Sequence, residues 1–275
     1  ATDGSNAAVS DTFILTVTNV NDAPTVTSAI ADASTAEDAS YSLNAAAAFT
    51  DVDSGDSLTY TMSGAPSTLS ISSGTISGTP TNANVGAHTI VVTATDGSNA
   101  AVSDTFILTV TNTNDAPTVA NAIADASTAE DASYSVSVSN VFADVDTGDS
   151  CTYSMSGAPS TITLSSGTIS GTPVNANVGA HTIVVTCTDG SSAAVSDSYV
   201  LTVTNTNDAP TVTSAIADAS TAEDASYSLN AAAAFTDVDS GDTLTYTMSG
   251  APSTLSISSG TISGTPTNAN VGAHT

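Results

Sequence analysis

Acidic side chains are the residues of this chain whose types and spacing could do chemistry. The 275-residue sequence has 27 Asp and Glu and no Lys or Arg, so its formal charge is −27. Most of the carboxylates lie in copies of three short turn-like motifs, AED (36–38), DVDSGD (51–56) and ATDG (94–97). Carboxylates packed this closely repel one another, and no basic side chain is present to neutralise them. Ca²⁺ takes oxygen ligands from irregular loops, so the motifs predict bound Ca²⁺; a solvated acidic surface is the alternative.

The same charge balance excludes several classes of function. Binding to nucleic acid or to an anionic membrane surface requires clustered Lys and Arg. Phosphoryl transfer of the P-loop or kinase type requires a Lys. No segment approaches the ~18 apolar residues of a membrane span. The expected partners are therefore cations, with neither nucleic acid nor a membrane span.

Two other chemical interpretations fail on particular residues. DVDSGD is typical of the start of an EF-hand loop, but Met62 stands at the twelfth position, where that loop needs a bidentate Glu. His88, His181 and His274 are one repeated position, and no GxSxG motif accompanies them. We therefore expect a structural or surface His, no zinc site and no enzyme activity.

A repeat of 93 residues supplies the elements that must position the carboxylates. NDAP recurs at Asn21, Asn114 and Asn207 with no insertion between copies. This period is too long for a solenoid unit and suits an independent sandwich domain. The predicted domains are 23–115, 116–208 and 209–275, the last truncated before its last strands, with 1–22 as the C-terminal part of a preceding repeat. We expect a piece of a longer array; completion of the interrupted repeat by a neighbouring molecule is the alternative.

Short strands separated by turn residues are predicted within each repeat. The predicted strands of the first copy are 24–30, 39–49, 57–62, a hairpin over 68–77 around Ser73-Gly74, 88–95 and 104–111, roughly seven in all. The alanine run at 45–48 is assigned to a strand, because the middle copy places valines there. No helix is expected.

Five motifs in order carry a resemblance to a known family. They are AED (36–38), FTDVDSGDSLTY (49–60), SGTISGTP (73–80), GAHTIVVTATDG (86–97) and TNTNDAP (111–117). This series resembles the dystroglycan-type cadherin-like repeat and the related Ig-like repeat of large bacterial surface proteins. The resemblance covers the whole chain. It implies an all-β fold of tandem seven-stranded Ig/cadherin-like β-sandwich domains in a linear array, and an extracellular location, secreted or at the cell surface.

The resemblance also implies a Ca²⁺ site at each junction, built from a Glu of one domain, the linker Asn-Asp and the DxD and AxD of the next domain. The first full junction comprises Glu37, Asn112, Asn114, Asp115, Asp144, Asp146 and Asp189. The second comprises Glu130, Asn205, Asn207, Asp208, Asp237 and Asp239. The partial one at the start comprises Asn19, Asn21, Asp22, Asp51, Asp53 and Asp96.

Two departures from the family pattern bear on the number of ions. The first linker position is Asn where cadherins usually have Asp, and GTPTNANVG (78–86) replaces an acidic motif. With fewer charges per junction, we expect fewer or weaker ions than in the animal proteins, about one or two per junction.

Both cysteines lie in the middle repeat. Cys151 replaces Leu58, and Cys187 replaces Ala94. Both positions belong to the inward face of their predicted strands, and the resemblance implies that these strands are neighbours in one sheet. It therefore implies a disulfide, which suits an oxidising compartment. Two buried free thiols are the alternative.

These expectations combine into one functional hypothesis and one main alternative. The hypothesis is a calcium-rigidified structural repeat region of a long extracellular adhesin, stalk or fibre. The alternative is a subunit of a self-assembling extracellular filament or sheath, with identical chains as lateral or end-to-end partners. A carbohydrate-binding module is disfavoured because the chain has no Trp and only 4% aromatic residues for stacking on sugars.

Overall fold

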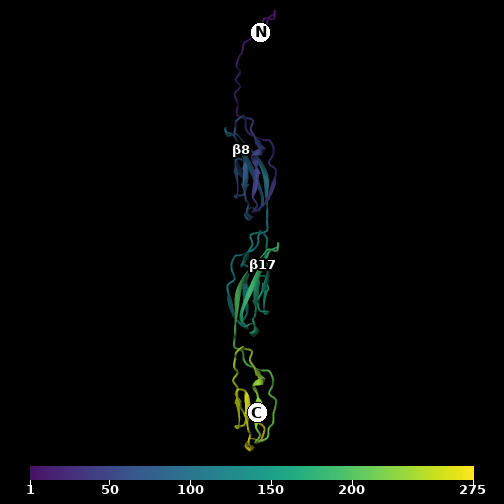
Figure 1. Ribbon diagram of the computed structural model, residues 1–275, viewed down its shortest axis with the longest axis vertical. Helices are drawn as coiled ribbons and strands as arrows, with labels where there is room; N and C mark the ends of the chain where they lie inside the picture. Colours follow the sequence, from purple (N-terminus) through teal and green to yellow (C-terminus); the bar gives the residue numbers. More distant parts are fainter. The chain divides into compact units, whose positions relative to one another are not determined.

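The computed structural model describes all 275 residues as strands, loops and a few 3-10 turns. The chain divides into two compact units, one of residues 1–115 and 145–148, the other of residues 116–144 and 149–275. Within the units, the strands of each repeat form their own sandwich, with β8 in the first repeat and β17 in the second (Figure 1).

The first repeat contains nine strands in three sheets. The larger sheet has the order β2-β9-β8-β5, formed by Ala33–Ala36, Ala101–Thr111, Gly86–Thr95 and Thr59–Ser63. The second sheet has the order β3-β7-β6, formed by Tyr41–Asn44, Thr75–Gly78 and Leu69–Ser72. A small pair joins β1 (Thr25–Val26) to β4 (Phe49–Thr50). All pairs are antiparallel except β2 with β9, which run parallel.

The second repeat has the same topology. Its larger sheet, β11-β18-β17-β14, is formed by Ala126–Ala129, Ala194–Thr204, Gly179–Thr188 and Thr152–Ser156. Its second sheet, β12-β16-β15, is formed by Tyr134–Ser137, Thr168–Gly171 and Ile162–Ser165, and β10 (Thr118–Val119) pairs with β13 (Phe142–Ala143).

The two ends of the chain hold fewer strands. The third repeat contains β19 (Thr211–Val212), β20 (Tyr227–Asn230), β21 (Phe235–Thr236), β22 (Leu255–Ser258) and β23 (Thr261–Gly264). They form the sheets β20-β23-β22 and β19-β21. Residues 1–22 contain one isolated bridge, between Thr2 and Ala8.

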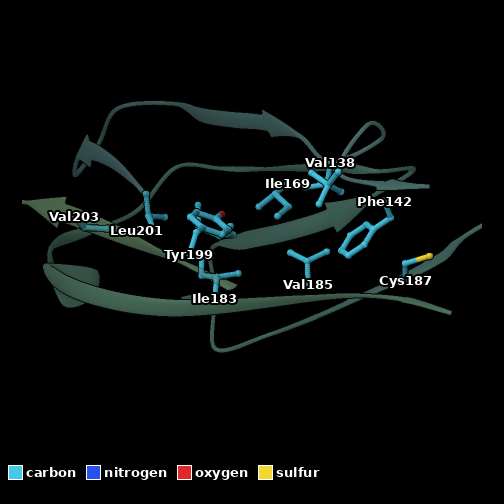
Figure 2. Close-up of a cluster of buried hydrophobic side chains, with 11 residues drawn as sticks. Val138, Phe142, Ile169, Ile183, Val185, Cys187, Tyr199, Leu201 and Val203 are labelled. Atoms are coloured by element: carbon cyan, nitrogen blue, oxygen red, sulfur yellow. The ribbon is translucent and has the colours of Figure 1, made fainter. Parts of the chain in front are cut away.

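Alternation of apolar and hydroxylated residues builds the core of each sandwich. In the second repeat, β17 directs Ile183, Val185 and Cys187 inward, and β18 directs Tyr199 and Leu201 toward them (Figure 2). All five are almost completely buried, at 0–2% exposure. Because successive strand residues point to opposite faces, the intervening residues, among them Thr186 and Ser198, lie on the outer face. Burial of each large aliphatic side chain contributes about 1.5–3 kcal/mol, so a core without Trp is sufficient.

The all-β sandwich class is confirmed, and so is the hairpin. Strands β6 and β7 flank Ser73 and Gly74, whose φ angles of 47° and 74° are both positive. Two consecutive left-handed residues are the requirement of a type I′ turn, the turn that best matches the twist of a hairpin.

The strand assigned to the alanine run is wrong. Ala45–Ala48 form the 3-10 turn η1, and the Ala46 N–H donates to the carbonyl of Gly74 at 3.1 Å. Ala45 and Ala48 fill the core at 1% and 6% exposure, while Val138 and Val141 occupy this region of the middle repeat at 0% and 4%. The valines of the middle repeat therefore indicated that side chains are buried at a turn, not that the segment is an extended strand. The turn divides the predicted segment 39–49 into β3 and β4, and β2 is an additional strand, so nine strands replace the expected seven.

Candidate metal centre

Parallel strand pairing positions the glutamate of the second junction, which lies within one compact unit. Strand β11 pairs with β18 so that Ala129 lies beside Thr204, and Glu130 follows directly. The Glu130 N–H donates to the Thr204 carbonyl at 2.9 Å, and the Thr206 N–H donates to Glu130 Oε1 at 2.8 Å. The end of this sheet therefore holds the Glu130 carboxylate against the linker that follows β18.

The DVD loop of the third repeat meets the same linker. Asp239 Oδ2 accepts the Asp208 N–H at 2.6 Å, and Asp239 Oδ1 accepts the side-chain amide of Asn175 at 3.0 Å. Asp237 Oδ1 accepts the Asp239 N–H at 3.0 Å, which fixes the shape of the loop. These bonds bring the loop, the linker and the end of the preceding repeat together.

Three carboxylates converge at this point without a basic partner. One oxygen from each of Glu130, Asp208 and Asp239 lies within 4.8 Å of the other two, and Asp237, Asp239 and Asp242 form a second such group. Glu130 is 2% exposed, and its Oε2 is buried without a hydrogen-bond partner. Burial, and then the charges of Asp239, Asp131 and Asp237, raise the pKa of Asp208.

This donor set fits a hard divalent cation. All of the converging atoms are carboxylate oxygens, the ligands that Ca²⁺ prefers, and the partnerless Glu130 Oε2 lacks the compensation that a buried anionic oxygen requires. A bound cation would supply that compensation. Asp242 was not among the predicted ligands; its place in DVDSGD, three residues after the second Asp, was the signal that could have identified it.

Part of the first junction lies within the other unit and contains a related acidic group. Glu37, Asp38 and Asp115 form an acidic group within 4.8 Å, and Glu37 Oε1 accepts the Thr113 N–H at 2.9 Å. Asp146 Oδ2 accepts the Asp115 N–H at 2.8 Å. Glu37 is 2% exposed, and its Oε2 is buried without a hydrogen-bond partner. Asp38 is an addition to the predicted set, supplied by the AED motif itself.

The remaining predicted ligands of the two full junctions lie as follows. Asp189 is 7% exposed, and its Oδ1 accepts the N–H groups of Ser191 and Ala193 at 2.9 and 2.8 Å. Asp144 is half-buried. The side-chain amides of Asn114 and Asn207 each donate to the carbonyl of the following Asp at 2.8 Å. Asn112 and Asn205, like Asn19 at the start, are exposed.

Short hydrogen bonds join residues of the predicted partial site at the start of the chain. Asp53 Oδ2 accepts the Asp22 N–H at 2.7 Å, and Asp96 Oδ2 accepts the Asn21 amide at 2.9 Å. Asp51, Asp56 and Asp96 converge within 4.8 Å, and Asp51 Oδ2 is buried without a partner. The hydrogen bond from Asn21 is the main cause that lowers the pKa of Asp96, although burial opposes it.

Two of the acidic residues in each complete repeat have a different, structural use. Asp104 Oδ2 accepts the Ile30 N–H at 2.6 Å, and Asp32 Oδ1 accepts the Ile107 N–H at 2.7 Å. The second repeat has the same pair of bonds, from Ile123 to Asp197 and from Val200 to Asp125. These carboxylates satisfy backbone donors where the 24–33 segment and its equivalent pass the sheet, and they do not join the acidic groups.

The two cysteines are bonded to each other in the structure. Their Cα atoms are 5.1 Å apart and 36 residues separate them in the sequence. The strand register pairs Cys187 with Tyr153, so Cys151 reaches it diagonally from the residue before β14 rather than from the directly facing position.

The histidines have a local structural partner in all three copies. The Nε2 atoms of His88 and His181 lie 2.7 Å from the carbonyl oxygens of Asn84 and Asn177, and that of His274 lies 2.8 Å from that of Asn270. In the first two copies the His thus ties a 3-10 turn to the strand that follows it. No helix in the structure has the length and apolar character needed to cross a membrane.

Comparison with known protein families identifies the family of this chain. The profile of the Putative Ig domain family matches residues 23–111, 116–204 and 209–275. The "Serine-rich adhesin for platelets" of Staphylococcus aureus (strain MRSA252) is 34% identical over 151 residues, which are 54% of this chain and 11% of the adhesin. The chain thus spans only a small part of that relative.

Solved structures show a more distant likeness. Extracellular cadherin domains 1–4 of protocadherin gamma B7 align at 19% identity and a TM-score of 0.48, over 90% of this chain and 69% of that one. An endo-fucoidan hydrolase of glycoside hydrolase family 107 aligns at 21% identity and a TM-score of 0.33, over 67% of this chain and 29% of that one. Both scores are below 0.5, so the assignment rests on the profile, which matches three successive segments. The chain belongs to the Putative Ig domain family, as three tandem copies.

Proposed function

We propose that this chain is a structural, non-catalytic repeat region of an extracellular or cell-surface adhesin, in which Ca²⁺ at the repeat junctions restricts bending. The family membership and the similarity to a staphylococcal adhesin support the adhesin part. One observation carries the calcium part: in both complete junctions a buried Glu with a partnerless oxygen stands within 4.8 Å of the linker Asp.

The residues present would hold the ion by their oxygens. At the second junction, Glu130, Asp208 and Asp239 converge, and Asp237 and Asp242 approach Asp239 from the same loop. A bound Ca²⁺ would supply positive charge among these carboxylates in a chain that has no Lys or Arg. Because the ligands come from one repeat, the linker and the next repeat, holding them together limits the freedom of the linker.

Calorimetric titration of the whole chain with Ca²⁺ tests the proposal, with Glu130→Gln as the informative variant. Gln keeps the size and the Oε1 acceptor but removes the charge, so we expect fewer Ca²⁺ bound and a smaller rise in melting temperature on Ca²⁺ addition. Glu223→Gln is the matched control, since Glu223 is the equivalent residue of the third repeat and is exposed. Absence of Ca²⁺ binding by the unmodified chain, or equal binding by Glu130→Gln, would contradict the proposal.

A filament or sheath is the second candidate, and the outer faces of the sheets favour it. Exposed positions of β5 are Thr59, Thr61 and Ser63, and on the neighbouring strands the hydroxyls of Thr93 and Ser103 lie 2.8 Å apart. These residues carry hydroxyls and no charge, so identical chains could pack side by side through them without direct repulsion. Sedimentation velocity over a range of concentrations in Ca²⁺ separates the candidates, because lateral assembly raises the sedimentation coefficient with concentration and a separate stalk does not.

A further inference from the structure

A 3-10 turn next to each junction has no part in the function proposed above. It has the sequence Asn-Ala-Asn and occurs as η2 (Asn82–Asn84), η3 (Asn175–Asn177) and η5 (Asn268–Asn270), each just before a strand or its equivalent. The two asparagines of each turn do different things. The second holds the turn to its own repeat, and in the first two copies the first asparagine reaches the following repeat.

The second asparagine makes the turn rigid. Asn177 Oδ1 accepts the Val174 N–H at 3.0 Å and the Thr161 hydroxyl at 2.9 Å, and the Asn177 carbonyl lies 2.7 Å from His181 Nε2. Asn84 and Asn270 make the corresponding bonds in their repeats. The first asparagine therefore projects from a base that is fixed by three contacts.

The first asparagine donates to the DVD loop of the next repeat. Asn175 Nδ2 lies 3.0 Å from Asp239 Oδ1, while Asp239 Oδ2 accepts the Asp208 N–H. Asn82 Nδ2 lies 2.9 Å from Asp146 Oδ1 in the same way. Asp239 and Asp146 are each 6% exposed, so both carboxylates are held in place and shielded from water.

We propose that Asn82 and Asn175 are latch residues, which couple one repeat to the next without a cation and orient the aspartate that faces the acidic group. A carboxamide suits this task because it donates a hydrogen bond and leaves the negative charge of the carboxylate intact. A Lys or Arg in its place would cancel that charge and compete with a cation. The coupling does not depend on a bound ion; only the orienting consequence rests on the proposed function.

Hydrogen exchange of the whole chain in excess chelator tests the latch, with Asn175→Ala as the first variant. Loss of the Asn175 bond frees Asp239, which in turn holds the Asp208 N–H. We expect amides of 206–208 and 237–242 to exchange roughly tenfold to a hundredfold faster, the equivalent of about one hydrogen bond to a carboxylate. Asn268→Ala is the matched control, since this chain has no residue of a following repeat for Asn268 to contact, and it should leave these amides unchanged.

A second variant, Asn175→Asp, separates the latch from a general effect of truncation. It places a carboxylate against the Asp239 carboxylate at the same side-chain length, so exchange in chelator should be faster than in Asn175→Ala. Asn82→Ala should produce the same acceleration around Asp115 and Asp146, at the other junction. Calcium titration of Asn175→Ala should show weaker binding at one junction.

The outcomes distinguish the latch from the calcium proposal. If the unmodified chain binds no Ca²⁺ but Asn175→Ala accelerates exchange in chelator, the calcium proposal fails and the latch stands. The latch would be overturned if Asn175→Ala exchanged in chelator at the same rate as the unmodified chain. It would also be overturned if Asn268→Ala accelerated the same amides as much as Asn175→Ala. Loss of protection in β17 itself would also overturn it, because the turn would then serve only its own repeat.

Discussion

At the scale of single residues, the carboxylates of each repeat divide into two uses. Glu130, Asp208 and Asp239 converge where no Lys or Arg neutralises them, whereas Asp125 and Asp197 accept backbone N–H groups and do not belong to that acidic group. The sequence motifs predicted the first use, because acidic residues crowded into turns require compensation. They could not predict the second, because the N–H that Asp197 accepts belongs to Ile123, 74 residues earlier.

The structural carboxylates give a prediction that does not involve calcium. Asp197→Ala leaves the Ile123 N–H without its acceptor in a half-buried position, so we expect the middle repeat to lose about 1–3 kcal/mol of stability. Hydrogen exchange of β17 and β18 amides measures the loss. Asp197→Asn retains an oxygen acceptor and serves as the control, with a smaller expected effect. An effect of Asp197→Ala that appears only when Ca²⁺ is present would contradict the structural assignment.

At the scale of elements, period-two patterns predicted the long strands well and the short ones poorly. Residues 88–95 and 104–111 lie within β8 and β9, whose buried Ile90, Val92 and Leu108 alternate with exposed or half-buried residues. The parallel strand β2, with the sequence ASTA, was missed because its residues show no such alternation. Its placement depends on pairing with Leu108 to Thr111, which is a tertiary contact. In the second repeat, the corresponding pairing of β11 with β18 brings Glu130 to the linker.

The disulfide belongs to this scale, because it fastens the beginning of β14 to β17. Closing a loop over the sequence separation of 36 residues stabilises the middle repeat by roughly 3–4 kcal/mol in the chain-entropy estimate. We expect reduction to lower the melting temperature of this repeat alone. Cys151→Leu with Cys187→Ala restores the residues of the first repeat and should show no response to reductant. Intact-mass measurement after alkylation checks the bond; two thiols alkylated in denatured, unreduced protein would show that it is absent.

At the scale of the whole molecule, charge and repetition together support a structural role. A formal charge of −27 without any Lys or Arg leaves cations as the natural counter-charge, and the acidic groups recur at both complete junctions. The family and its tandem copies were recognisable from the sequence, since five motifs recur in order. The residues that join one repeat to the next were only partly recognisable, since Asn175 lies 64 residues from the Asp239 that it contacts and carries no charge.

The central claim is that Ca²⁺ at the junctions restricts the bending of one repeat against the next. Small-angle X-ray scattering of the whole chain, recorded in Ca²⁺ and again in excess chelator, tests it most directly. The account predicts that chelation broadens the distribution of interatomic distances in the unmodified chain and changes its maximum dimension. In the double variant Asp144→Asn with Asp146→Asn, the difference between the two conditions should be smaller. Scattering curves that superimpose in Ca²⁺ and in chelator would contradict it.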